Sequence, residues 1–166
     1  MKKGVVITGK NNLDKILDIK SEICEKIDEV VMSYQEQIVL LNKLYLEEEK
    51  DKTKIITREI IKKINGYKNQ DIKKHIYNEK KLISFEDTIE KIVISKLKCH
   101  YCFQKMNILF TKVRDETQWT LDRIYNDQCH SKENTVVSCL KCNLQRRCQD
   151  AKKFTFTKQL RISKIG

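Results

Sequence analysis

The chain of 166 residues carries 34 Lys and Arg side chains against 23 Asp and Glu, a formal net charge of +11 at pH 7. Its 40% hydrophobic content is enough for a globular core, which excludes a wholly disordered chain. No apolar run approaches the roughly 18 residues that a membrane helix needs, and the apolar stretch after Lys3 is too short for the roughly 7–15-residue core of a signal peptide. We therefore expect an intracellular protein without membrane contact.

The basic excess is concentrated at the C-terminal end. Residues 140–166 hold eight basic side chains and a single acidic one, Asp150. Residues 99–139, in contrast, carry equal numbers of basic and acidic side chains. A segment with such a one-sided charge is the electrostatic footprint that a polyanion binds, so we expect DNA as a partner.

The N-terminal part of the chain is predicted to open with a long helix. Apolar side chains from Leu13 to Leu44 follow a heptad, which predicts one amphipathic helix over residues 13–44. Lys20 and Gln37 interrupt the apolar seam of this helix. The pattern therefore leaves two partners open for the seam: a second copy of the chain, which gives a homodimer, or the helices predicted over 56–93.

Three shorter helices are expected next. The first carries an isoleucine-rich face from Ile56 onward and ends at the Asn65-Gly66 stop signal. The second spans about 71–81. The third is opened by Ser84, which together with Asp87 resembles an N-terminal capping box.

Four of the seven cysteines form two pairs with the spacing of metal ligands. The pairs are Cys99-x-x-Cys102 and Cys139-x-x-Cys142. Each pair offers two thiolates on one tight turn, and two such turns complete a tetrahedral four-thiolate shell around Zn²⁺. Buried apolar cysteines or a disulfide are the alternatives. We expect a structural zinc ion, because two pairs with this spacing rarely arise by accident.

The part of the chain around these pairs is predicted to contain strands. Residues 118–124 alternate apolar and polar side chains, with Trp119, Leu121 and Arg123 on one side, as a strand requires. Residues 135–138 form a second short strand, and a basic helix runs from Cys142 to about Lys153. The alternation of Phe154 and Phe156 with Thr predicts that a last short strand returns to the core.

The predicted fold class is α+β. A helical region, 1–97, precedes a small zinc-braced module, 98–153, and a basic C-terminal tail, 154–166.

Three segments around the cysteine pairs resemble, in this order, the HNH endonuclease family: Trp119-Thr-Leu-Asp122-Arg123-Ile, Cys129-His130-Ser-Lys-Glu-Asn134-Thr-Val-Val and Cys139-Leu-Lys-Cys142-Asn143. The match covers roughly residues 99–150 and is similar to HNH-like proteins of large DNA viruses and phages. It implies a ββα-metal fold, a strand–loop–strand–helix unit that four cysteines brace through zinc. For a viral protein of this kind, the expected location is the cytoplasm or nucleus of a host cell.

The resemblance also implies roles for single residues. Asp122 and Asn143 would hold a catalytic divalent ion, and Asn134 would hold the loop between the strands through its side-chain amide. A carboxylate and an amide oxygen leave most of the coordination to water and phosphate, which suits Mg²⁺ or Mn²⁺. Such an ion polarises the scissile phosphate of DNA. The alternatives are a surface ion pair for Asp122 and a helix cap for Asn143.

The chain departs from the family at Arg123, where the family has its general base, a histidine. A guanidinium with a pKa above about 12 cannot accept a proton from water, but its fork can bind a phosphate. His130 is the nearest titratable candidate for the base, and an ordinary loop histidine is the alternative. Two functions therefore stay open: a metal-dependent DNA endonuclease, or an HNH-like module that binds DNA without cutting it.

Basic side chains after the last cysteine pair are the predicted DNA contacts, together with Arg123: Arg146, Arg147, Lys152 and Lys153. A solvated basic face is the alternative. A scaffold that dimerises through residues 13–44 is a third function, which predicts that removal of the basic tail has no effect.

Overall fold

The computed structural model describes residues 32–48, 50–110, 112 and 114–160. The fold below is that of residues 32–48, 50–110 and 114–160. Residues 13–31 of the predicted helix 13–44, with that part of the possible homodimer seam, lie outside the described residues. The end of the basic tail, 161–166, lies outside them too.

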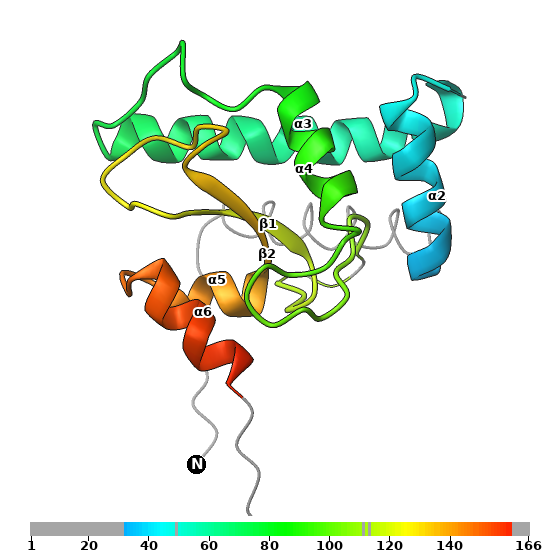
Figure 1. Ribbon diagram of the computed structural model, residues 1–166. Coiled ribbons are helices and arrows are strands. Elements are labelled where there is room, and N and C mark those ends of the chain that lie inside the picture. The colour runs from blue at the N-terminus through cyan, green and yellow to red at the C-terminus, as the bar shows by residue number, and fades with distance from the viewer. Residues whose placement is uncertain (1–31, 49, 111, 113, 161–166) are drawn as a thin grey trace, which may run out of the picture. The chain divides into compact units, whose positions relative to one another are not determined.

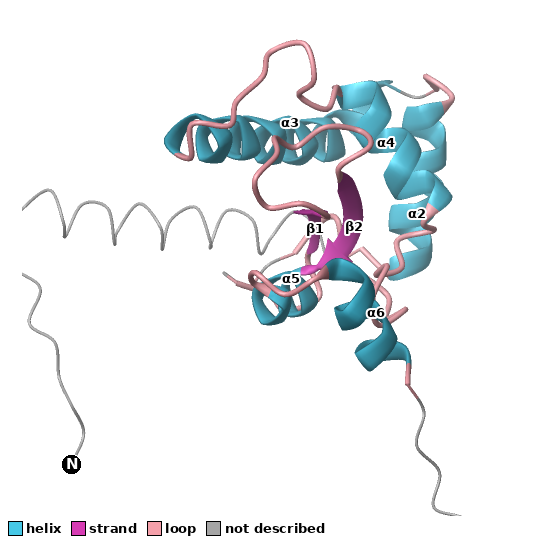
Figure 2. Ribbon diagram, turned by 60° about the vertical axis from the view of Figure 1, so that its left-hand side comes forward, coloured by secondary structure: helices cyan, strands magenta, loops and turns pink. Residues whose placement is uncertain are grey.

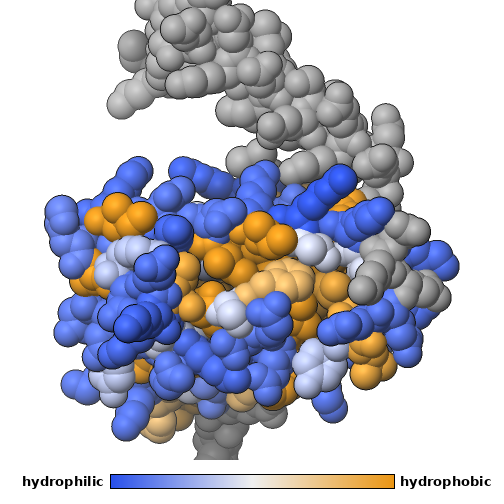
Figure 3. Space-filling model, turned by 90° about the horizontal axis from the view of Figure 1, so that it is seen from above, coloured by the Kyte–Doolittle hydropathy of each residue, from blue (hydrophilic) through white to orange (hydrophobic). Residues whose placement is uncertain are grey.

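Three helices form one side of this unit: α2 (Tyr34–Tyr45), α3 (Lys50–Lys73) and α4 (Phe85–Ile94). The long helix α3 lies along the sheet, and α2 and α4 both pack against it (Figure 1). Ile56 and Ile60 of α3 and Ile92 of α4 are wholly buried between these helices. The isoleucine face that the sequence predicts therefore forms the core of the helical layer. On the face that carries α3 and α4, apolar side chains gather within a hydrophilic rim (Figure 3).

Two helix boundaries differ from the prediction. The predicted continuous helix 13–44 is wrong at Ser33, which is extended (φ −62°, ψ 157°) and caps α2 through a capping box with Glu36. The seam position Gln37 is buried in α2, where its side-chain oxygen accepts hydrogen bonds from the backbone N–H groups of Ile108 and Leu109. A polar residue that interrupts the heptad thus binds a buried loop of the same chain.

The helix that was expected to stop at Gly66 continues to Lys73, so the separate helix over 71–81 is also wrong. A methyl group added at Gly66 would meet no atom within 4 Å, and the helix passes through it without strain. Packing of α3 outweighs the loss of about 1 kcal/mol in helix propensity that a glycine causes. At Ser84 the prediction is confirmed, because its hydroxyl accepts the N–H of Asp87 at the start of α4.

The sheet has two antiparallel strands, β1 (Trp119–Arg123) and β2 (Thr135–Cys139), with Leu121 opposite Val137. The strands lie between α3 on one side and α5 (Leu140–Arg146) on the other (Figure 2). Both faces of β1 are therefore buried, and the two faces touch different helices. The Leu121 N–H donates to Tyr67 of α3 (2.9 Å), whereas Asn143 of α5 donates to Thr120 (3.1 Å).

The predicted single helix from Cys142 to Lys153 is two helices, α5 and α6 (Ala151–Gln159). Arg147 breaks them with φ 50°, and Asp150 caps α6 through the N–H of Lys153. The predicted strand at Phe154 and Phe156 is wrong, because both residues belong to α6. Phe154 packs edge-on against Tyr101 (5.0 Å between centroids), and Phe156 is 68% exposed.

The architecture is thus α+β: a helical layer, a small two-stranded antiparallel sheet, and two C-terminal helices. Along the chain, β1, β2 and α5 follow one another as strand, loop, strand and helix. Among the described residues, no helix has the length and apolar character that crossing a membrane requires.

Candidate functional site

The two cysteine pairs come together at one point of the fold. Cys99 and Cys102 lie on the tight turn after α4, and Cys139 and Cys142 lie where β2 meets α5. Their four sulfur atoms all lie within 4.8 Å of one another. All four are free thiols, and the 3.9 Å between the sulfurs of Cys102 and Cys139 excludes a disulfide, which needs about 2.05 Å.

The spacing of the sulfurs fits a tetrahedral metal ion. With Zn–S bonds of about 2.3 Å, the edges of a four-sulfur tetrahedron measure about 3.8 Å, close to the 3.9 Å between Cys102 and Cys139. Burial raises the pKa of the Cys142 thiol to about 12, whereas the hydrogen bond from Cys139 lowers the pKa of Cys99 to about 4. Deprotonation of all four thiols at this spacing requires a cation that offsets the charge of the four thiolates. The cluster can therefore hold a metal ion such as Zn²⁺.

The turn that carries Cys99 and Cys102 is tied to β2. The Cys99 N–H donates to the Gln104 carbonyl (3.0 Å), which closes the turn, and Phe103 takes the positive φ of 58° that the turn needs. The His100 N–H donates to the Val137 carbonyl of β2 (2.9 Å). This hydrogen bond fixes the position of the turn relative to the sheet.

Asp122, the predicted ion ligand on β1, is buried and already bonded on both oxygens. Its Oδ2 accepts the Tyr101 hydroxyl (2.6 Å) and Nε of Arg146, and its Oδ1 accepts Nη2 of Arg146 (2.8 Å). Burial, together with the hydrogen bond to Asp122, raises the pKa of Tyr101, so this hydroxyl stays protonated and donates. Tyr101 belongs to the Cys99–Cys102 turn, so the cysteine cluster and Asp122 are joined through one side chain.

A cavity of about 600 Å³ opens between α3, β1 and α5. Four of the predicted site residues line it together: Asp122, Arg123, His130 and Asn143. Asn143 is half-buried at the second turn of α5, where its amide nitrogen donates to Thr120. Lys74 and Arg147 add two exposed cationic side chains to the same lining. The fold therefore gathers acidic, amide, imidazole and cationic groups from four parts of the chain.

His130 and Arg123 meet at a carboxylate that comes from outside the cysteine module. Asp71, in the last turn of α3, is wholly buried. It accepts Nδ1 of His130 (2.7 Å) and Nη1 of Arg123 (3.4 Å). Burial lowers the pKa of His130, while Asp71 acts in the opposite direction, so the imidazole is neutral at pH 7.

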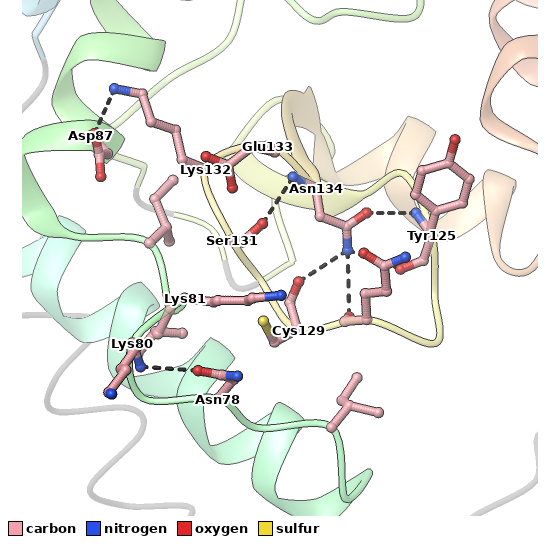
Figure 4. A pocket seen from close by; sticks show the side chains of 14 residues that line it. Asn78, Lys80, Lys81, Asp87, Tyr125, Cys129, Ser131, Lys132, Glu133 and Asn134 are labelled. Carbon is pink, nitrogen blue, oxygen red and sulfur yellow. Dashed lines mark hydrogen bonds and ion pairs between the residues drawn. The ribbon is translucent and has the colours of Figure 1, made fainter.

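Asn134 fastens the loop between the strands. Its amide nitrogen donates to the carbonyls of Tyr125 and Cys129 (both 3.0 Å), and its side-chain oxygen accepts the Tyr125 N–H (2.8 Å). Asn134, Cys129 and Tyr125 also line a second cavity, of about 840 Å³. Figure 4 shows how Asn134 bonds to the other two residues there. The side chain thus holds both ends of the loop segment that leads to His130.

The predicted DNA contacts separate into buried and exposed residues. Arg147, Lys152 and Lys153 are exposed, as binding to a phosphate requires. Arg146 is only 1% exposed, and its guanidinium donates to Asp122, Arg123, Asn126 and Gln149, so it presents almost no surface to a phosphate. Its burial follows from the carboxylate of Asp122, which needs a cationic partner at that depth.

Two residues of this site were missed by the sequence analysis. Asp71 lies 59 positions before its partner His130, and no spacing rule links the two. Tyr67 lies four residues before Asp71, on the same face of α3, and its ring stacks on His130 (4.6 Å between centroids, 25°). The only signal in the sequence was a carboxylate one helical turn after an aromatic residue, which is common on exposed helices.

Comparisons of the chain with protein-family models, with curated proteins and with solved structures find no match. A function therefore has to be argued from the residues of the site.

Proposed function

We propose that residues 98–160 form a zinc-braced module of HNH type that hydrolyses phosphodiester bonds in DNA. One observation carries this proposal: Asp122 and Arg123 of β1, His130 of the loop after it and Asn143 of α5 line the same cavity. The strand–loop–strand–helix order of β1, β2 and α5 and the four-cysteine cluster are the arrangement that the resemblance implies.

The carboxylate and amide oxygens at the cavity are the kind of ligand that a divalent ion such as Mg²⁺ prefers. Asp122 Oδ1, which accepts one hydrogen bond, and the side-chain oxygen of Asn143 would hold Mg²⁺ or Mn²⁺. When bound, such an ion polarises the scissile phosphate and stabilises the leaving oxygen. The guanidinium of Arg146 competes with it for Asp122, so ion binding and the Asp122–Arg146 pair are coupled.

The other side chains of the site have separate roles in the hydrolysis. His130, neutral at pH 7, accepts the proton of the attacking water at its Nε2. The guanidinium of Arg123 offsets the negative charge that develops on the phosphate. Lys74 and Arg147, at the cavity, and Lys152 and Lys153, on α6, attract the DNA backbone.

Supercoiled plasmid incubated with the full chain, with and without Mg²⁺ or Mn²⁺, tests the proposal. We expect metal-dependent nicking that Asn143→Ala abolishes, while DNA binding persists. Asn65→Ala, an exposed amide on α3, is the matched control and keeps full activity. Nicking that survives in Asn143→Ala, or that needs no divalent ion, contradicts the proposed site.

A second candidate is an HNH-like module that binds DNA without cutting it. The Asp122–Arg146 pair favours it, because a neutralised carboxylate attracts a cation less strongly. The substitution Arg123→His separates the two functions, since it restores an imidazole at the family's base position. A wild-type chain that never nicks DNA, together with an Arg123→His variant that does, supports the binding module.

A further inference from the structure

Asp71 is a buried carboxylate to which the proposed reaction gives no role. It has no exposed surface, and both of its side-chain partners, His130 and Arg123, line the cavity of about 600 Å³. A buried charge is costly unless it is paired and hydrogen-bonded. The groups that pair with Asp71 and offset this cost therefore indicate its role.

Both oxygens of Asp71 bind His130. Oδ1 accepts the ring Nδ1 at 2.7 Å, and Oδ2 accepts the backbone N–H of the same residue at 2.7 Å. An ionised carboxylate only accepts hydrogen bonds, so the ring proton lies on Nδ1 and the lone pair lies on Nε2. No described residue provides a hydrogen-bond partner for Nε2. The nitrogen that a base would use is thus the one left open.

A stacked aromatic ring fixes the plane of the His130 imidazole. The Tyr67 ring stacks on it, and the Tyr67 hydroxyl accepts the Leu121 N–H of β1, one residue before Asp122. The third partner of Asp71, Nη1 of Arg123 at 3.4 Å, also comes from β1. One turn of α3 therefore aligns the loop histidine with the strand that carries Asp122 and Arg123.

We propose that Asp71 is the positioning residue of the site: it holds His130 in the Nδ1–H tautomer with Nε2 open toward the cavity, and it holds Arg123 beside it. This role rests on the proposed function, in which His130 takes the proton from water. Asp71 itself touches neither DNA nor the reacting water, so its effect passes through His130 and Arg123.

Four groups decide how His130 titrates. Asp71 favours its protonated form, whereas Arg123 and Lys74 disfavour it, and the stacked Tyr67 is uncharged. Asp71→Asn removes the only group of the four that favours protonation. The pKa of His130 therefore falls further, and the low-pH limb of the rate profile moves to lower pH. A residue with a merely structural role would change stability without moving this limb.

Two measurements on the full zinc-loaded chain test the role. Nitrogen-15 NMR of His130 in the wild type is expected to show the Nδ1–H tautomer, and in Asp71→Asn a lower pKa. Nicking of supercoiled plasmid by Asp71→Asn is expected to be about 10²-fold slower at saturating DNA, a typical size for lost base catalysis, with KM nearly unchanged. Asp127→Asn, an exposed carboxylate in the same loop, is the matched control for lost charge.

The two proposals fail in different ways. A wild-type chain that shows no nicking contradicts the nuclease, while the NMR measurement still decides whether Asp71 holds His130. An Nε2–H tautomer in the wild type overturns the positioning role, and this result does not depend on whether any variant folds. An unchanged pKa of His130 in a folded Asp71→Asn variant overturns it as well.

Discussion

The carboxylate of Asp122 on β1 and the guanidinium of Arg146 on α5 form a buried, two-point ion pair that ties the sheet to the helix after it. Arg146 also donates to the carbonyls of Arg123 (2.5 Å) and Gln149 (2.7 Å), so it connects the end of β1 with the segment before α6. This arginine is thus a structural centre of the module rather than part of its surface. Its pairing also sets how available Asp122 is to a cation.

Loss of Arg146 is expected to destabilise the fold strongly. Arg146→Gln leaves the charge of Asp122 buried without its cationic partner, and breaking such a pair costs about 3–5 kcal/mol. Urea unfolding of the full chain measures the difference in the free energy of unfolding. Arg147→Gln, the exposed neighbour, is the control and is expected to change it by less than about 0.5 kcal/mol. Equal effects of the two substitutions would contradict the ion pair.

The cysteine cluster is expected to bind about one zinc ion per chain. Cys139→Ser removes one ligand but leaves a hydroxyl that can still cap α5, so zinc content should fall, and thermal stability with it. Elemental analysis and a thermal melt with and without a chelator provide the two measurements. Cys148→Ser, an exposed cysteine outside the cluster, should keep both values. A fully folded, zinc-free wild-type chain would show that the cluster is not a structural metal site.

DNA affinity is expected to depend steeply on salt. Each phosphate contact that is lost lowers the slope of log K against log salt by about 0.9. Neutralisation of Arg147, Lys152 and Lys153 to Gln should therefore reduce the slope by up to about 3. Fluorescence anisotropy with a labelled duplex at several salt concentrations measures it. Gln at three exposed lysines of α3 removes the same charge as a control: Lys52, Lys54 and Lys62. A larger effect of that control would move the DNA surface to α3.

Stability is expected to fall on mild acidification because of His130. Burial lowers its pKa in the folded state below the value of about 6.5 that it has when unfolded. The unfolded chain therefore binds the proton first. The contribution of His130 is complete above about pH 6.5 and is lost as the pH falls through its folded pKa. Urea unfolding at a series of pH values measures this loss, and His130→Gln should remove it. The exposed His75→Gln should leave the pH dependence as it is in the wild type.

Local signals in the sequence determined the elements with short-range causes. The alternation around Trp119 predicts β1, Ser84 predicts the start of α4, and the two cysteine pairs predict the four-cysteine cluster. Each of these depends on residues within a few positions of one another, whose spacing directly sets their geometry. The same kind of signal, Ser33 with Glu36, marks the start of α2, but it was overlooked within the longer heptad pattern.

Only the tertiary structure decided which charged groups meet. The sequence placed Arg146 on the surface and left Asp71 without a role, yet each is the buried partner of a predicted site residue. Likewise, Gly66 locally predicts the end of a helix, but packing of α3 against the sheet and the other helices extends the helix to Lys73. This extension places Asp71 within hydrogen-bond distance of His130. The physical reason is that pairing of buried charges and burial of apolar faces depend on contacts between distant segments, which no local spacing specifies.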